Sequence, residues 1–221
     1  TKTLNNASSD MPEKEIDRKL SALRKGGRWS PSTFGRLKDL GPQVELAVQT
    51  ACRDSFSLFA YTLKIDYKGK PRVFESVAAP FQRFCLDDMS SNLEALRDGR
   101  QPDNRRFWVE RTKKAGKDSD MAIVLLWQIA FPVRPIYLQV GAADKEQAAI
   151  VKQRISHLLH WNPWLNNFVE VVQWEVRSKR KLESGQPLAR LDIMSSDTGG
   201  AHGGTPDLLL INELSHVNKW E

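Results

Sequence analysis

Residues 107–130 read FWVERTKKAGKDSDMAIVLLWQIA, a short apolar segment followed by a basic loop and a long apolar run. Its order predicts a short apolar strand at Phe107–Glu110, a tight loop that ends in Gly-Lys, and a buried helix over Lys117–Ala130. Such a unit suits phosphate binding, because backbone N–H groups at the helix N-terminus face the anion and the lysine reaches the terminal phosphates. A solvated basic turn before a buried helix is the alternative interpretation.

The loop departs from the general phosphate-loop pattern at two positions. Arg111 stands where that pattern has its first glycine, and Asp118 stands where it has Ser or Thr. The loop alone is therefore weak support for a nucleotide site, and a second element is needed.

That second element is the apolar run Leu208–Ile211, which predicts a central strand and is followed by Asn212 and Glu213. Ligands of open parallel sheets bind at the carboxyl ends of the strands. A carboxylate there can orient and activate the water that attacks a γ-phosphate. Glu213 could instead cap a neighbouring helix. The Gly-Lys loop and this strand, in this order, support the nucleotide site better together than either does alone.

From Arg106 onward, short apolar segments alternate with helical ones, which is typical of a sheet built from crossover units. We therefore expect an α/β fold of the P-loop NTPase type, with a parallel central sheet and helices on both faces. Three domain ranges are expected: a flexible basic tail and linker at 1–43, a helical segment at 44–100 and the ATPase core at 101–221. The other predicted elements are helices at Val44–Leu63, Phe81–Leu96 and Asp144–His160, a turn at Tyr67–Pro71, strands at Pro135–Val140, Phe168–Trp174 and Leu191–Ser195, and a basic loop at Arg177–Lys181.

Composition narrows the function classes. A chain of 221 residues with 40% hydrophobic and 27% charged residues can form one main globular domain. The net charge of +6 favours a polyanionic partner, and the basic stretches Arg177–Lys181 and Arg105–Arg106 could follow a phosphate backbone, although such runs are usually solvated faces. The longest apolar run, Met121–Val133, is too short to cross a bilayer, so no membrane partner is expected.

The loop Thr112–Lys117 resembles the phosphate loop of phage terminase large subunits, which commonly has a basic residue four positions before the lysine. The strand Tyr137–Val140, followed by small residues and an acidic helix start, is also similar to that family. So is the glycine-rich approach Ser195–Asp207 to the acidic strand. Pro80-Phe81-Gln82 is similar to the family's adenine-recognising glutamine segment, with a plain polar residue in a first helical turn as the alternative. The resemblance covers residues 79–221.

The resemblance implies roles for individual residues. Lys117 would bind the β- and γ-phosphates, Glu213 would activate water, and Gln82 would read adenine. Lys113 stands where the family usually has an arginine that stabilises transition-state charge, and Arg111 is a possible substitute. The loop residues expected to contact ATP are Lys114, Ala115, Gly116, Lys117, Asp118 and Ser119.

Two departures from the family concern magnesium. The loop hydroxyl that binds the metal is Asp118 here, and the aspartate before the catalytic glutamate is Asn212. One hypothesis is a swapped Mg²⁺ site, in which Asp118 supplies the anionic oxygen and Asn212 a neutral ligand or a water contact. The swap places extra negative charge close to the phosphates. An impaired hydrolase is the alternative.

The resemblance implies a viral protein of the host cytoplasm that uses ATP to drive double-stranded DNA into a procapsid. Its implied partners are a portal protein, a small terminase subunit and further copies in a ring. The family's coupling motif and nuclease domain are expected to lie outside this chain. A helicase-like nucleic-acid translocase and a non-hydrolysing nucleotide-binding assembly module are the alternative functions.

Overall fold

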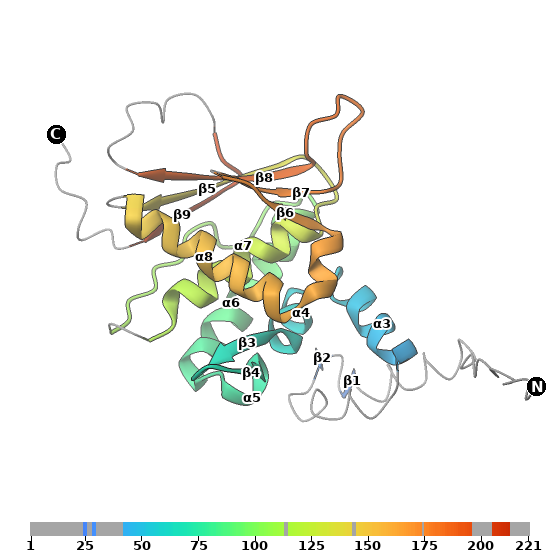
Figure 1. Cartoon of the computed structure of the whole chain (residues 1–221), viewed down its shortest axis with the longest axis vertical. Coiled ribbons are helices and arrows are strands. Elements are labelled where there is room, and N and C mark those ends of the chain that lie inside the picture. The colour runs from blue at the N-terminus through green and yellow to red at the C-terminus, as the bar shows by residue number, and fades with distance from the viewer. Residues whose placement is uncertain are drawn as a thin grey trace, which may run out of the picture.

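The computed structural model describes residues 24–25, 28–29, 42–112, 115–142, 145–173, 175–195 and 205–212. Runs of helices and runs of strands follow one another along this part of the chain (Figure 1). The elements are, in chain order, β1 Arg24–Lys25, β2 Arg28–Trp29, α3 Pro42–Ala51, α4 Phe56–Thr62, β3 Lys64–Tyr67, β4 Lys70–Val73, α5 Phe74–Val77, α6 Pro80–Arg97, α7 Lys117–Ala130, β5 Ile136–Ala142, α8 Lys145–Trp161, the 3-10 helix η2 Pro163–Asn167, β6 Val169–Val171, β7 Glu175–Ser178, β8 Ala189–Ser195 and β9 Leu208–Asn212.

The centre of the molecule is a five-stranded sheet with the order β6-β7-β8-β5-β9. β5 pairs in parallel with β8 on one side and with β9 on the other. β6, β7 and β8 pair in antiparallel fashion. The fold is therefore α/β with a mixed sheet, and the predicted parallel arrangement describes only β8, β5 and β9.

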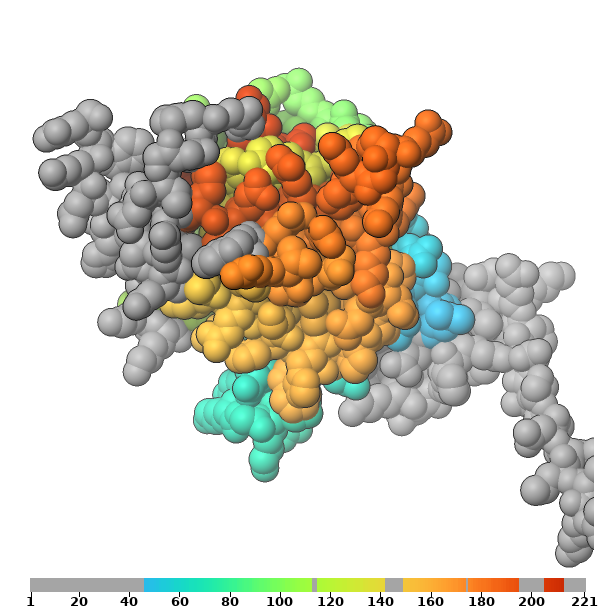
Figure 2. Space-filling view, turned by 45° about the horizontal axis from the view of Figure 1, so that its top comes forward, coloured from blue at the N-terminus to red at the C-terminus, as the bar shows by residue number. Residues whose placement is uncertain are grey.

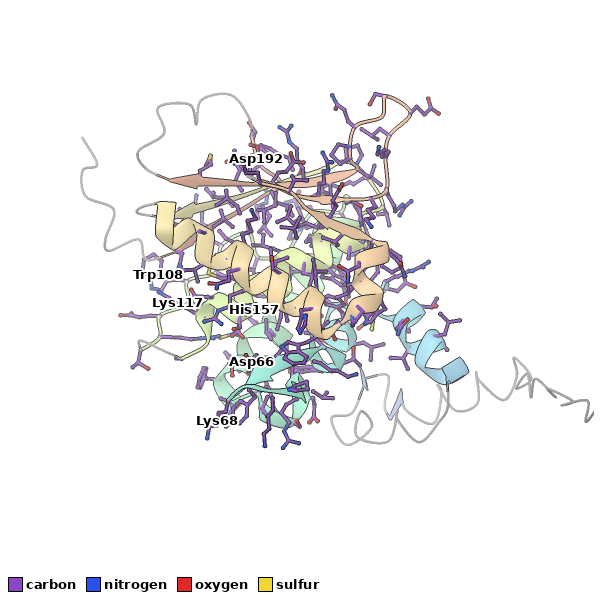
Figure 3. The ribbon with its side chains drawn as sticks, viewed as in Figure 1. Asp66, Lys68, Trp108, Lys117, His157 and Asp192 are labelled. Carbon is purple, nitrogen blue, oxygen red and sulfur yellow. The ribbon has the colours of Figure 1, made fainter. Side chains whose placement is uncertain are left out.

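α7 and α8 cover the same face of the sheet (Figure 1). On that face Ile136, Leu138 and Val140 alternate along β5 and are buried in the hydrophobic core. On the other face Arg190 and Leu209 are exposed, and Figure 3 shows Asp192 on the side of the sheet away from these helices. The prediction of helices on both faces is thus wrong for the described residues.

The predicted strand at Phe107–Glu110 is absent, although these residues are described. Trp108 is 78% exposed and Val109 is 41% exposed. A strand forms only when a neighbouring backbone accepts and donates the ladder hydrogen bonds. Local apolar character predicted the strand, but among the described residues no partner strand pairs with this segment.

β9 also lies elsewhere than predicted. It is an edge strand of the described sheet rather than a central one, and Leu209 and Ile211 are each 46% exposed. The predicted basic loop Arg177–Lys181 begins inside β7. The predicted strand Phe168–Trp174 is reduced to the three residues of β6.

The predicted helix Val44–Leu63 is split into α3 and α4, because Ser55 starts a new helix by accepting the N–H of Leu58. α6 and α7 closely match their predicted ranges. The core is continuous between the helical segment and the sheet, as the contact between the rings of Phe56 and Trp127 shows. The three predicted domain ranges stay predictions.

The predicted turn at Tyr67–Pro71 joins β3 and β4 into a hairpin with a two-residue turn. Lys68 and Gly69 have φ angles of 54° and 76°, and Tyr67 pairs with Lys70. Positive φ at both central positions is the geometry of a type I′ turn, whose twist matches that of the strands. The Asp66 carboxylate supports the turn by accepting the N–H of Gly69 at 2.8 Å.

Candidate functional site

The loop before α7 is shaped by Gly116. This residue caps the helix with φ 79° and ψ 11°, a left-handed conformation that glycine adopts without the strain a side chain causes. The N–H of Ala115 donates to the Thr112 carbonyl at 3.2 Å, which closes the turn in front of it. Lys117 is the first residue of α7 and is half-buried (Figure 3). The backbone therefore turns sharply into a helix N-terminus at the position the sequence predicts.

The end of β9 contacts the first turn of α7. The Asn212 side-chain amide donates from Nδ2 to Oδ1 of Asp118 at 3.1 Å, across 94 residues of sequence. Asn212 is 2% exposed and Asp118 is half-buried. The structure thus brings together the two side chains proposed for magnesium. Glu213, Lys113 and Lys114 lie outside the described residues.

A buried ion pair lies directly under the loop. Arg111 forms a salt bridge with Asp120, and their side chains are 7% and 9% exposed. Gln82 Nε2 donates to the other Asp120 oxygen at 2.8 Å. Burial raises the pKa of the Asp120 carboxyl, because desolvation outweighs the opposite effects of Arg111 and Gln82. The ion pair links the segment before the loop to the first turn of α7. The Gln82 hydrogen bond links the same turn to α6.

This arrangement restricts two of the predicted roles. The Arg111 guanidinium lies between Asp120 and the Phe81 ring, 5.0 Å from the ring centroid, so only its N–H groups that do not bind Asp120 remain for a phosphate. Gln82 Oε1 already accepts the N–H of Ala79 at 3.1 Å. With Nε2 donating to Asp120, the Gln82 amide keeps one N–H and one lone pair for adenine.

Sequence reasoning missed Asp120. The available signal was a carboxylate in the first turn of an otherwise apolar helix, at a position that the structure shows to be 6% exposed. Charges at such positions are rarely buried without a partner. The partners, Arg111 and Gln82, could not be assigned from spacing, because Gln82 is 38 residues away.

A paired substitution tests the shape of the loop. At Gly116 an added Cβ would stand 3.0 Å from Gln82 Nε2, whereas at Gly69, with φ 76°, it would meet nothing within 4 Å. A left-handed conformation costs a non-glycine residue about 1–2 kcal/mol. We expect Gly69→Ala to lower the free energy of unfolding by about that amount and Gly116→Ala to lower it further, because Gln82 must move away from Asp120. Urea unfolding measures both, and equal losses would contradict the close approach of Gln82.

None of the described helices combines the length and the apolar character that a membrane crossing demands.

Comparison with known proteins places the fold. No family model and no curated protein matches the chain. Among solved structures, the chain is similar to the crystal structure of the HK97 bacteriophage large terminase, with a TM-score of 0.54 and 21% sequence identity. The match covers 72% of this chain and 30% of that terminase, so this chain spans less than a third of its length. The chain therefore has a terminase-like fold.

Proposed function

We propose that this chain binds and hydrolyses ATP as the motor part of a phage terminase large subunit, which moves double-stranded DNA into a procapsid in the host cytoplasm. The hydrogen bond between Asn212 and Asp118 carries the proposal, because it joins the carboxyl end of β9 to the first turn of α7. The terminase-like fold supports it. A portal protein, a small terminase subunit and further copies of the chain in a ring are the proposed partners.

In this proposal the residues around the turn into α7 have separate roles in binding and hydrolysis. Lys117 attracts the β- and γ-phosphates, and Gly116 lets the backbone approach them. Lys114, Ala115 and Ser119 complete the loop. Glu213, which follows Asn212 directly in the chain, orients the attacking water. Lys113 stabilises charge on the transferred phosphoryl group, and Arg111, which is paired with Asp120, is the substitute for that role.

Magnesium is proposed to bind between Asp118 and Asn212. A carboxylate and a side-chain amide carry the oxygen ligands that Mg²⁺ prefers, and the Asn212 amide, which presents its nitrogen to Asp118, would turn its oxygen toward the ion. In the part of the chain that is described, His, Cys, Asp and Glu nowhere gather in groups of three. The protein ligands are therefore few, which suits an ion that usually keeps several waters and binds substrate phosphates.

Phosphate release and binding of a fluorescent ATP analogue test the proposal. We expect Lys117→Ala to lower magnesium-dependent turnover by about 100-fold and to weaken nucleotide binding, because a charged donor to the phosphates is lost. Glu213→Gln should lower turnover by about 100-fold and leave binding intact, because it removes only the base. Lys179→Ala, at an exposed lysine after β7, is the control for loss of one charge. Wild-type turnover by Lys117→Ala would contradict the proposed site.

The swapped metal site has its own test. Asp118→Ala should abolish magnesium-dependent turnover. Asn212→Asp should reduce turnover, because two carboxylates would then face each other. The double variant Asp118→Ser with Asn212→Asp restores the pair of groups usual in terminases and should recover activity. Unchanged magnesium-dependent turnover in Asp118→Ala would show that the swap is wrong.

A non-hydrolysing nucleotide-binding module is the second candidate. The observation that favours it is the Asp118 carboxylate in the first turn of α7, where it adds negative charge beside the phosphates. This function predicts nucleotide binding without phosphate release, with or without duplex DNA. Stimulation by single strands or RNA in the same assay would instead indicate a helicase-like translocase.

A further inference from the structure

The β3–β4 hairpin projects from the helical side of the molecule, and Figure 2 shows it as the teal lobe below the body. Figure 3 shows Lys68 at its outer end. Seven of its side chains are exposed, namely Lys64, Asp66, Tyr67, Lys68, Lys70, Pro71 and Arg72. A projecting arm of this kind is accessible to a large partner.

The charge of the hairpin is uncompensated. It carries four basic side chains and one acidic side chain, Asp66. None of the four basic side chains forms a salt bridge with any residue that the structure describes. The partly exposed Arg134 and Arg177, by contrast, are paired with Asp207 and with Glu170. The Asp66 carboxylate is occupied by the N–H of Gly69.

The strand register gathers the cations around an aromatic ring. Tyr67 pairs with Lys70 and Ile65 pairs with Arg72, and cross-strand partners lie on the same face of a ladder. The Lys68 ammonium lies 5.4 Å from the centroid of the Tyr67 ring. Lys70 and Arg72 are two residues apart on one strand, hence about 7 Å apart. That distance is about twice the 3.4 Å rise, measured along the helix axis, between successive phosphates of one DNA strand.

The base of the hairpin is fixed to α8. The Asn162 amide accepts the N–H of Lys64 at 2.9 Å and donates to the Lys64 carbonyl at 2.8 Å. Asn162 is 4% exposed. At the other strand, the N–H of Phe74 donates to the Leu63 carbonyl at 2.7 Å. The arm is therefore held in one orientation before any partner arrives, which reduces the entropy lost on binding.

We propose that the hairpin face formed by Tyr67, Lys68, Lys70 and Arg72 binds the phosphate backbone of a nucleic acid. The three cations contact phosphates, and the Tyr67 ring packs against a sugar. Such contacts do not read sequence, so affinity should depend on salt rather than on base order. The inference rests on the proposed function only for the choice of duplex DNA as the probe.

Fluorescence anisotropy with a labelled duplex of about 20 base pairs, at about 50–200 mM salt and without nucleotide, tests the inference. The triple variant Lys68→Gln, Lys70→Gln, Arg72→Gln should bind about 10-fold more weakly near 0.1 M salt, with a salt slope smaller by about 3. A second triple variant, Arg177→Gln, Lys179→Gln, Lys181→Gln, removes the same charge at and after β7. It should bind like the wild type.

Three results would overturn the inference: wild-type binding by the hairpin variant, an equal loss in both triple variants, or loss only in the β7 variant. Lys68→Arg with Lys70→Arg keeps the charge and should keep the affinity, which would show that positive charge at these positions, and not lysine itself, is what binding requires. Hairpin-dependent binding to phosphatidylserine vesicles that matches the DNA affinity would assign the face to lipid instead. Phosphate release without DNA is measured separately, so failure of the ATPase proposal and failure of this one are distinguishable.

Discussion

Asp120→Ala is expected to lower the free energy of unfolding by about 3–5 kcal/mol, although the residue lies on the first turn of a helix. The substitution leaves the Arg111 guanidinium buried at 7% exposure without its counter-charge. It also removes the acceptor of the Gln82 amide. An unpaired buried charge costs several times more than the pair contributes, because water cannot solvate it. Urea unfolding at neutral pH measures the loss.

The matched control removes both charges. Arg111→Met with Asp120→Leu should unfold within about 1 kcal/mol of the wild type, because apolar replacements of a buried ion pair are often neutral. A double variant as unstable as Asp120→Ala would show that the pair itself stabilises the fold. The same double variant reports on phosphoryl transfer: if it folds but loses turnover, Arg111 has a role at the nucleotide, and if it keeps turnover, Arg111 is structural.

Trp127→Ala should lower the free energy of unfolding by about 3–5 kcal/mol, because the side chain is fully buried and its removal leaves a large cavity. The indole packs edge-on against Phe56 with centroids 5.6 Å apart, and the Arg97 guanidinium lies 5.0 Å from the indole ring centroid. Its Nε1 donates to the Cys52 carbonyl at 2.8 Å. The residue thus joins α7 to α4, α6 and the end of α3.

Trp127→Phe separates the hydrogen bond from the packing. It keeps most of the aromatic surface but leaves the buried Cys52 carbonyl without its donor, which should cost about 1–3 kcal/mol. Thermal and urea unfolding of both variants give the two contributions. A loss below about 1 kcal/mol in Trp127→Ala would mean that the helical segment and the sheet do not share one core.

The elements that sequence reasoning located well are those with a long local pattern. α6, α7 and α8 have apolar residues at helical spacing, and β5 is a short apolar run followed by small residues. One element that it placed wrongly, Phe107–Glu110, has a strand-like composition but lacks a partner among the described strands. Strand formation depends on a distant backbone, which local composition does not specify.

Part of the candidate site could also be predicted from the sequence, and part could not. The turn at Gly116 follows from local chemistry, since a glycine before a helix start marks a left-handed residue. The order of the motifs also placed Asp118 and Asn212 on two sides of one position, and the structure brings them into contact, while their role at a metal stays a prediction. The ion pair of Arg111 with Asp120 was not foreseen, because a helix pattern does not show which neighbouring element covers it.

The contact between Asn212 and Asp118 presents the amide nitrogen, and not the amide oxygen, to the carboxylate. A cation held by both side chains would therefore require the Asn212 amide to turn its oxygen toward the ion. That turn breaks the hydrogen bond between the end of β9 and the first turn of α7, so cation binding and loss of this contact are linked, and each shifts the other by the same free energy.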